Sequence, residues 1–102
     1  MVQKIAVVYK IVNSLNGKLY VGASAQGAGI RWQQHKQNLR TQIHHSGHLQ
    51  KAWNKYGSNN FKFEILEIVE NSTSKLLQER EQYWIDFYDA ANPLKGYNIC
   101  PK

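Results

Sequence analysis

The chain has 102 residues, of which 42% are hydrophobic, so it is long enough for one folded domain and too short for two. Thirteen Lys and Arg against seven Asp and Glu give a net charge of +6, and a single cysteine, Cys100, excludes an intrachain disulfide framework and a cysteine-based zinc finger. No apolar run approaches the roughly 20 residues that cross a bilayer, so we expect one domain over residues 1–102 in a reducing, cytoplasmic compartment, with no linker or second domain.

The first part of the chain predicts a hairpin followed by a helix. Residues 5–12 are rich in β-branched and aromatic side chains, as strands are, and residues 18–22 form the returning strand. Asn16-Gly17 between them is typical of a tight hairpin turn, because both residues tolerate positive φ. After a small, glycine-rich loop at 24–29, apolar residues recur at helical spacing and predict a helix over 30–40.

The second part predicts a helix, a strand and a longer helix. The second helix of the chain begins near Ser46 and ends at Tyr56, with Gly57 as its C-terminal cap. Residues 60–69 predict a strand, in which alternate residues share one face: Phe61, Phe63 and Ile65. Residues 73–89 predict the longest helix, with an apolar side that carries Leu76, Leu77, Trp84, Phe87 and Tyr88. The order β-β-α-α-β-α predicts a small α+β domain, a three-stranded antiparallel sheet flanked by about three helices.

One carboxylate on the last predicted helix is out of place. With residues about 100° apart on a helical wheel, Glu81 falls on the apolar side with Leu77, Trp84 and Tyr88. A carboxylate there must be paired, bound to a metal or placed in a cleft, because an unpaired buried charge is costly. Two interpretations therefore stand, a salt bridge with a base such as Arg80 or a functional site.

The first predicted helix carries a similar pattern. Arg31 and His35 are four residues apart, so they project from one face of the helix. One interpretation is that the two side chains belong to a functional site. The alternative is a solvated arginine beside a histidine that packs against Trp32.

The charges are unevenly distributed along the chain. No acidic residue precedes Glu64, whereas nine of the thirteen Lys and Arg and all four histidines lie in residues 1–63. This asymmetry predicts an acidic partner, most commonly nucleic acid, and the alternative is a basic surface that serves solubility alone.

Several short motifs occur in a specific order and spacing. Val7-Val8-Tyr9 is followed by Tyr20-Val21-Gly22, then by Arg31 and His35, and later by Glu79-Arg80-Glu81 and Gly96-Tyr97-Asn98. From residue 5 to residue 99 the chain resembles the GIY-YIG nuclease family, in particular the catalytic domains of phage and intron-type homing endonucleases. Val7 stands where the family has a glycine, a departure that affects backbone geometry rather than a chemical group.

The resemblance implies a metal-dependent DNA endonuclease that hydrolyses phosphodiester bonds, with one Mg²⁺ or Mn²⁺ per site. It implies these roles: Tyr9 as general base, Tyr20 as its partner, Arg31 as phosphate clamp, His35 and His44 as supporting histidines, Glu81 as metal ligand and Asn98 as a supporting asparagine. His45 is adjacent to His44, so that assignment can shift by one residue.

The chemistry of these residue types agrees with the implied roles. Arg31 offers a permanent cation with planar donors suited to phosphate oxygens, and one carboxylate such as Glu81 suits Mg²⁺, which keeps most of its waters. Tyrosine has a reference pKa of about 10, and nearby cations favour its ionised form, so the acid-free part of the chain is expected to hold the pKa of Tyr9 down.

Two other interpretations of the basic residues remain. Phosphate contacts are expected from five side chains, Lys18, Lys36, Arg40, Lys51 and Lys55, and these would equally serve a non-catalytic nucleic-acid-binding module on the same fold. A metal site built from His35, His44, His45 and His48 is a third possibility. Homing-type relatives attach this domain to a DNA-binding region, so a fused or separate region of that kind is a possible partner.

Overall fold

A computed structural model describes residues 5–98 of the protein, and Cys100 and Pro101 of the predicted irregular tail lie outside this range. The elements are β1 (Val7–Asn13), β2 (Leu19–Ser24), α1 (Ala28–Arg40), α2 (Gly47–Tyr56), the 3₁₀ turn η1 (Ser58–Asn60), β3 (Phe61–Ile68) and α3 (Ser74–Tyr88). The predicted α+β class and the order β-β-α-α-β-α are confirmed. The loop predicted at 24–29 is shorter than expected, because β2 includes Ser24 and α1 begins at Ala28.

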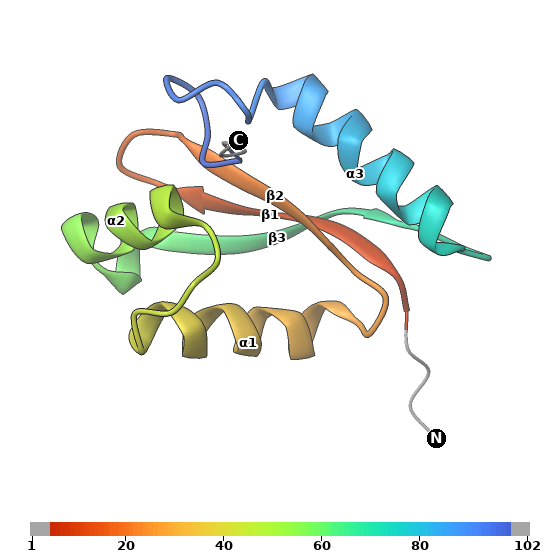
Figure 1. The fold of residues 1–102 in the computed structure, drawn as a ribbon, viewed down its shortest axis with the longest axis horizontal. Coiled ribbons are helices and arrows are strands. Elements are labelled where there is room, and N and C mark those ends of the chain that lie inside the picture. Colours follow the sequence, from red (N-terminus) through yellow and green to blue (C-terminus); the bar gives the residue numbers. More distant parts are fainter. Residues whose placement is uncertain (1–4, 99–102) are drawn as a thin grey trace.

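The three strands form one antiparallel sheet in the order β2-β1-β3, so the first strand of the chain is the central one. Figure 1 shows α3 on one face of the sheet and α1 on the other, with α2 beside the end of the sheet. Because β1 is covered on both faces, its side chains are almost all buried.

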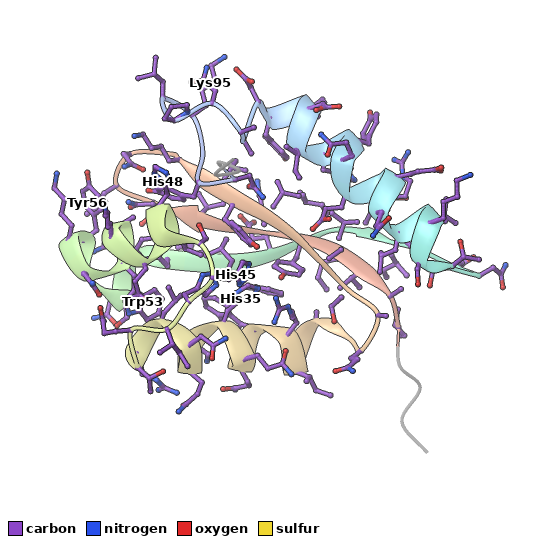
Figure 2. The ribbon with its side chains drawn as sticks, in the orientation of Figure 1. His35, His45, His48, Trp53, Tyr56 and Lys95 are labelled. Atoms are coloured by element: carbon purple, nitrogen blue, oxygen red, sulfur yellow. The ribbon has the colours of Figure 1, made fainter. Side chains whose placement is uncertain are left out.

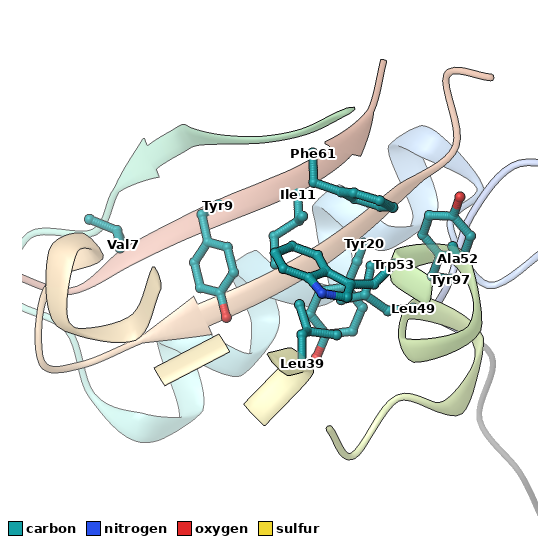
Figure 3. Close-up of a cluster of buried hydrophobic side chains, with 10 residues drawn as sticks. All are labelled: Val7, Tyr9, Ile11, Tyr20, Leu39, Leu49, Ala52, Trp53, Phe61 and Tyr97. Atoms are coloured by element: carbon teal, nitrogen blue, oxygen red, sulfur yellow. The ribbon is translucent and has the colours of Figure 1, made fainter. Parts of the chain in front are cut away.

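Two clusters of buried side chains hold the layers together. The α1-side core contains Val7, Tyr9, Ile11, Tyr20, Leu39, Leu49, Ala52, Trp53, Phe61 and Tyr97, all drawn in Figure 3. The α3-side core contains Ala6, Val8, Leu19, Val21, Val69 and Ala90, against which the apolar side of α3 packs. Successive residues of β1 alternate between the two cores, as the period of a strand requires.

A β-bulge interrupts the pairing of β1 with β3 beside Tyr9. Val8 pairs with Glu67 and Tyr9 pairs with Ile65, so Leu66 is the extra residue. Leu66 packs with the α3-side core, and Glu67 bonds to side chains of α3, so both residues face α3.

The apolar side of α3 differs from the prediction at one residue. Phe87 is 63% exposed, whereas Ile85 packs against the α3-side core together with Leu76, Leu77, Trp84 and Tyr88. The helix lies against a twisted sheet, so the buried stripe is shifted relative to an ideal wheel. Ile65 is likewise 52% exposed, since β3 is an edge strand. Within residues 5–98, no helix has the length and apolar character of a membrane span.

The segment after α3 returns to the sheet and pairs with β2. The Tyr97 amide donates to the Leu19 carbonyl at 2.9 Å, and the Asn98 amide donates to the Ala90 carbonyl at 3.0 Å. A side chain at Gly96 would overlap the Ala90 backbone, so glycine allows this close approach.

Gly96→Ala is expected to destabilise the fold by about 2 kcal/mol, because the methyl group meets backbone atoms that cannot move aside. In a chain of this size the melting temperature would fall by about 10 °C. Gly29→Ala is the control, since a methyl group there meets no atom and Gly29 lies in α1. Equal melting temperatures for the two variants would contradict the prediction.

Candidate active site

Tyr9 and Tyr20 come from adjacent strands and point into the same side of the sheet. In the hairpin register Tyr9 lies opposite Gly22 and Tyr20 lies opposite Ile11, so the two tyrosines are diagonal neighbours (Figure 3). A side chain at Gly22 would overlap the Tyr9 phenol. The glycine of the Tyr20-Val21-Gly22 motif therefore provides the space that the Tyr9 hydroxyl occupies.

Each tyrosine hydroxyl contacts a different histidine. The Tyr9 hydroxyl is hydrogen-bonded to Nε2 of His35, and the Tyr20 hydroxyl lies 2.7 Å from Nε2 of His45. His35 is 1% exposed and continues through its Nδ1 to Nε2 of His44, 2.6 Å away. Both adjacent histidines thus belong to the site, and the sequence assignment had chosen only His44.

His35 and His44 are neutral in this environment. Burial, reinforced by the positive charge of Arg31 and by neighbouring histidines, lowers the pKa of His35 to about 3. Burial and His45 lower the pKa of His44 to about 4. With pKa values this low, each ring is neutral at neutral pH and therefore has one acceptor nitrogen as well as one N–H donor.

The pKa of Tyr9 is raised in the structure, whereas the sequence predicted that it would be lowered. Burial is the largest effect and raises the pKa of Tyr9 well above its usual range, although the charge and polar contact of Arg31 lower it. Burial and the negative charge of Glu81 raise the pKa of Tyr20 to about 12. The cations of the site therefore offset only part of the desolvation of the two phenols.

Glu81 is partly buried, and the salt bridge considered for it is wrong. Arg80 pairs with Glu67 instead, at 2.9 Å from Nε to Oε1, and the Trp84 indole donates to the same carboxylate at 2.9 Å. Within residues 5–98, Glu81 has neither an ion pair nor a side-chain hydrogen bond. Burial raises the pKa of the Glu81 carboxyl, and the charge of Arg31 lowers it.

Arg31 and Glu81 belong to helices on opposite faces of the sheet. The charge of each affects the pKa of both tyrosine hydroxyls, and the charge of Arg31 lowers the pKa of the Glu81 carboxyl. β2, which carries Tyr20, is an edge strand, and α3 packs against it. Two tyrosines, an arginine and a carboxylate from four separate elements thus make up one candidate site.

The donors at this site suit one hard divalent cation. Glu81 supplies an anionic oxygen, and Mg²⁺ needs few protein ligands because it retains water and binds substrate phosphate. The described range contains no group of three or more His, Cys, Asp or Glu side chains that could hold a metal. A histidine metal site therefore has no support, and His48 lies apart from His35 and His45 on α2 (Figure 2).

Asn98 holds the backbone of β2 between Tyr20 and Gly22. Its Oδ1 accepts from the Val21 amide and its Nδ2 donates to the Val21 carbonyl, both at 2.7 Å. The side-chain amide thus pairs with the free edge of β2 as a neighbouring strand would. Asn98 fixes the strand that carries the site.

The five basic residues predicted to contact phosphate lie in two groups. Lys18, Lys51 and Lys55 line a groove of about 210 Å³ between α2 and the segment after α3. Lys36 and Arg40 line a second groove, of about 370 Å³, beside Trp32 and Trp53. Both grooves adjoin α2.

One contributor to the candidate site was missed in the sequence, the backbone amide of Ser46, which donates to Nδ1 of His44 at 3.0 Å. His45 was named as the alternative to His44, and both side chains lie at the candidate site. A signal for His45 did exist, since two adjacent histidines follow a helix that carries a third. A backbone amide leaves no signal in a sequence.

Comparisons with known proteins match this geometry. A profile described as the GIY-YIG catalytic domain matches residues 5–98. The chain is 40% identical over 93 residues to Intron-associated endonuclease 1 of Enterobacteria phage T4, covering 91% of this chain and 36% of that protein. It is 30% identical over 95 residues to Uncharacterized protein 019R of Invertebrate iridescent virus 6, covering 93% of this chain and 33% of that protein. The chain spans about a third of the length of these relatives.

Two solved structures share the fold. A mutant of the catalytic domain of intron endonuclease I-TevI matches with a TM-score of 0.84 and 35% identity over 96% of each chain. The catalytic domain of homing endonuclease I-TevI matches with a TM-score of 0.84 and 34% identity over 94% of this chain and 99% of that chain. On the profile match and these likenesses, the chain belongs to the GIY-YIG family, and its residues 5–98 are a GIY-YIG endonuclease catalytic domain.

Proposed function

We propose that this domain hydrolyses DNA phosphodiester bonds with the help of one divalent metal ion. The observation that carries the proposal is the Glu81 carboxylate, which is partly buried, lacks a protein partner within residues 5–98 and has its pKa lowered by the charge of Arg31 against the effect of burial. Such a carboxylate costs stability unless a ligand compensates it, so a module that only binds nucleic acid would have no use for it.

Arg31 and Glu81 divide the handling of charge. The Arg31 guanidinium would bind non-bridging oxygens of the scissile phosphate and stabilise the charge that develops during attack. Glu81 would hold a single Mg²⁺ or Mn²⁺, which supplies a Lewis acid at the phosphate and help for the leaving oxygen. One carboxylate at the site is consistent with one ion rather than a pair.

Tyr9 is the proposed general base and Tyr20 its partner. Tyr9 lies in the centre of the site, with its hydroxyl bonded to His35 and affected by the Arg31 guanidinium. Because burial raises its pKa, only a small fraction of Tyr9 is ionised at neutral pH, and that fraction takes the proton of the attacking water. Tyr20, held by His45, would hydrogen-bond the water or the phosphate.

The similarity to an intron-associated endonuclease and to a homing endonuclease supports DNA as the substrate. The two basic grooves beside α2 would bind phosphates on either side of the cleaved bond. Since the relatives are about three times longer, a DNA-binding region beyond this domain, fused or separate, is part of the proposal.

Glu81→Gln is expected to lower the rate of plasmid cleavage with Mg²⁺ by more than about 100-fold, because the amide cannot supply the anionic ligand. Cleavage of supercoiled plasmid, scored as nicked and linear product over time, measures it. Glu79→Gln is the matched control, since Glu79 is exposed on the same helix. Glu81→Gln protein that is folded and cleaves at the parental rate would contradict the proposal and favour a non-catalytic binding module.

Tyr9→Phe is expected to reduce cleavage by about 10²–10⁴-fold, the usual contribution of a general base, while DNA binding is retained. The parent rate should also rise about tenfold per pH unit between about pH 7 and 9, because the ionised fraction of a base increases with pH below its pKa. Tyr83→Phe, on the exposed side of α3, is the control. A rate that becomes constant near pH 7 would assign the base to another group.

Lys51→Gln combined with Lys55→Gln is expected to weaken binding to DNA of any sequence and to reduce the slope of log affinity against log salt by about two. Binding measured over a range of salt concentrations tests this. Lys62→Gln combined with Lys75→Gln removes the same charge from exposed positions outside both grooves and is the control. Equal slopes for the two double variants would exclude the groove lined by Lys18, Lys51 and Lys55 as a phosphate site.

A further inference from the structure

A chain of hydrogen bonds leads from the start of α2 to the Tyr9 oxygen. The Ser46 amide donates to Nδ1 of His44 at 3.0 Å. Nε2 of His44 lies 2.6 Å from Nδ1 of His35, and Nε2 of His35 bonds to the Tyr9 hydroxyl. Four groups thus make three successive contacts, and the two histidine rings between them lie edge to edge, with centroids 4.9 Å apart and planes inclined by 28°.

The first contact determines the direction of the others. A backbone N–H can only donate, so Nδ1 of His44 must accept, and a neutral His44 then carries its proton on Nε2. That proton is donated to Nδ1 of His35, which leaves the proton of His35 on Nε2. His35 therefore presents an N–H to the Tyr9 oxygen.

The reverse direction fails at Ser46. If the Tyr9 hydroxyl donated to a lone pair on Nε2 of His35, then His35 would donate from Nδ1 to His44, and Nδ1 of His44 would carry a proton. That proton would face the Ser46 N–H at 3.0 Å, two donors with no acceptor. His44 is 8% exposed and His35 is 1% exposed, so water offers little compensation for such a contact.

The Ser46 amide is held in place independently of the histidines. Ser46 is the N-cap of α2, where its Oγ accepts from the Leu49 amide at 3.2 Å and donates to the Tyr97 carbonyl at 3.1 Å. Its carbonyl accepts from the Gln50 amide at 3.0 Å. The start of α2 and the segment after α3 together fix the direction of the Ser46 N–H.

We propose that the Ser46 backbone amide is a positioning group that selects the Nε2–H tautomer of both His44 and His35, so that His35 always donates to the Tyr9 oxygen. The inference rests on the proposed function of Tyr9 as base and states what His35 does for it. His35 does not take the Tyr9 proton, because its only lone pair is occupied by His44. It stabilises the ionised phenol through an N–H donor.

Burial, together with neighbouring charged groups and not the Ser46 contact, lowers the pKa values of both histidines. A neutral His44 is the form that can accept from the Ser46 N–H. Within residues 5–98, no buried side-chain nitrogen or oxygen lacks a partner, so the chain of contacts is complete. The Arg31 guanidinium, which is also a donor, affects the Tyr9 hydroxyl as well, and the charges of Tyr20 and Glu81 act on it in the opposite sense. With His35 and Arg31 both donors, neither takes the proton of the Tyr9 hydroxyl.

Nitrogen-15 NMR of the histidine-labelled full chain tests the proposal without reference to cleavage. The nitrogen shifts distinguish the two neutral tautomers and the cation, and we expect Nε2–H for both His35 and His44 at neutral pH. An Nδ1–H tautomer or a cation at either ring would overturn the proposal. Because this readout needs no DNA or metal, its result is separate from whether Tyr9 is the base.

A pair of variants at Ser46 isolates the amide. Ser46→Ala removes the hydroxyl and keeps the N–H, whereas Ser46→Pro removes both, at a backbone φ of −90° that is near the range of proline. We expect the single tautomers to persist in Ser46→Ala and to become mixed in Ser46→Pro, which should cleave at least about tenfold more slowly than Ser46→Ala. Unchanged tautomers in a folded Ser46→Pro would overturn the proposal.

If Ser46→Pro does not fold, two variants of His44 decide. Gln at this position can donate an amide N–H to Nδ1 of His35, and Leu cannot. In His44→Gln, His35 should remain the Nε2–H tautomer. In His44→Leu, His35 should become a mixture of the two neutral tautomers. The same His35 spectrum in both variants would show that His44 does not set the tautomer.

Discussion

The phenol of Tyr9 lies over the backbone of Gly22, and the arrangement of the site depends on this contact. The antiparallel register of the hairpin brings a large side chain on the central strand opposite a residue with no side chain on the edge strand. The hydroxyl can therefore reach His35 on α1, while its ring stacks on Phe63 of β3 with centroids 4.7 Å apart. Packing on every side desolvates the phenol, which explains why its pKa is raised despite the nearby arginine.

The bulge in β3 has a similar influence on the other face of the sheet. Because Leu66 is an extra residue, Glu67 faces α3 and binds Arg80 and Trp84. The base adjacent to Glu81 in the sequence is thereby occupied, and within residues 5–98 Glu81 is left without an ion-pair partner. An irregularity in one strand thus makes a carboxylate available to the site, as bulges beside active sites commonly do by redirecting a side chain.

Most of the fold could be predicted because its signals are local. Asn16-Gly17 between two β-branched segments specified the hairpin, and Ser46 and Gly57 marked the two ends of α2. The errors arose where neighbours decide, as at Phe87, which the helical wheel buried and the shape of the sheet leaves exposed. The candidate site residues were found because Tyr9, Tyr20, Arg31, His35 and Glu81 keep a recognisable order. The hydrogen bonds and pKa values of these residues could not be predicted, because their burial depends on residues far away in the chain.

By itself, the sequence determined the element order, the family likeness and the chemical types assembled at the site. Those properties follow from periodicity, turn residues and motif spacing, which act over a few residues. Only the tertiary structure decided that Arg80 pairs with Glu67 and that each tyrosine contacts a different histidine. It also decided that the Ser46 backbone amide donates to His44, the first histidine of the chain of contacts. The reason is physical, because the protonation and pairing of a buried group are set by the direction of its neighbours' donors and by the water they exclude.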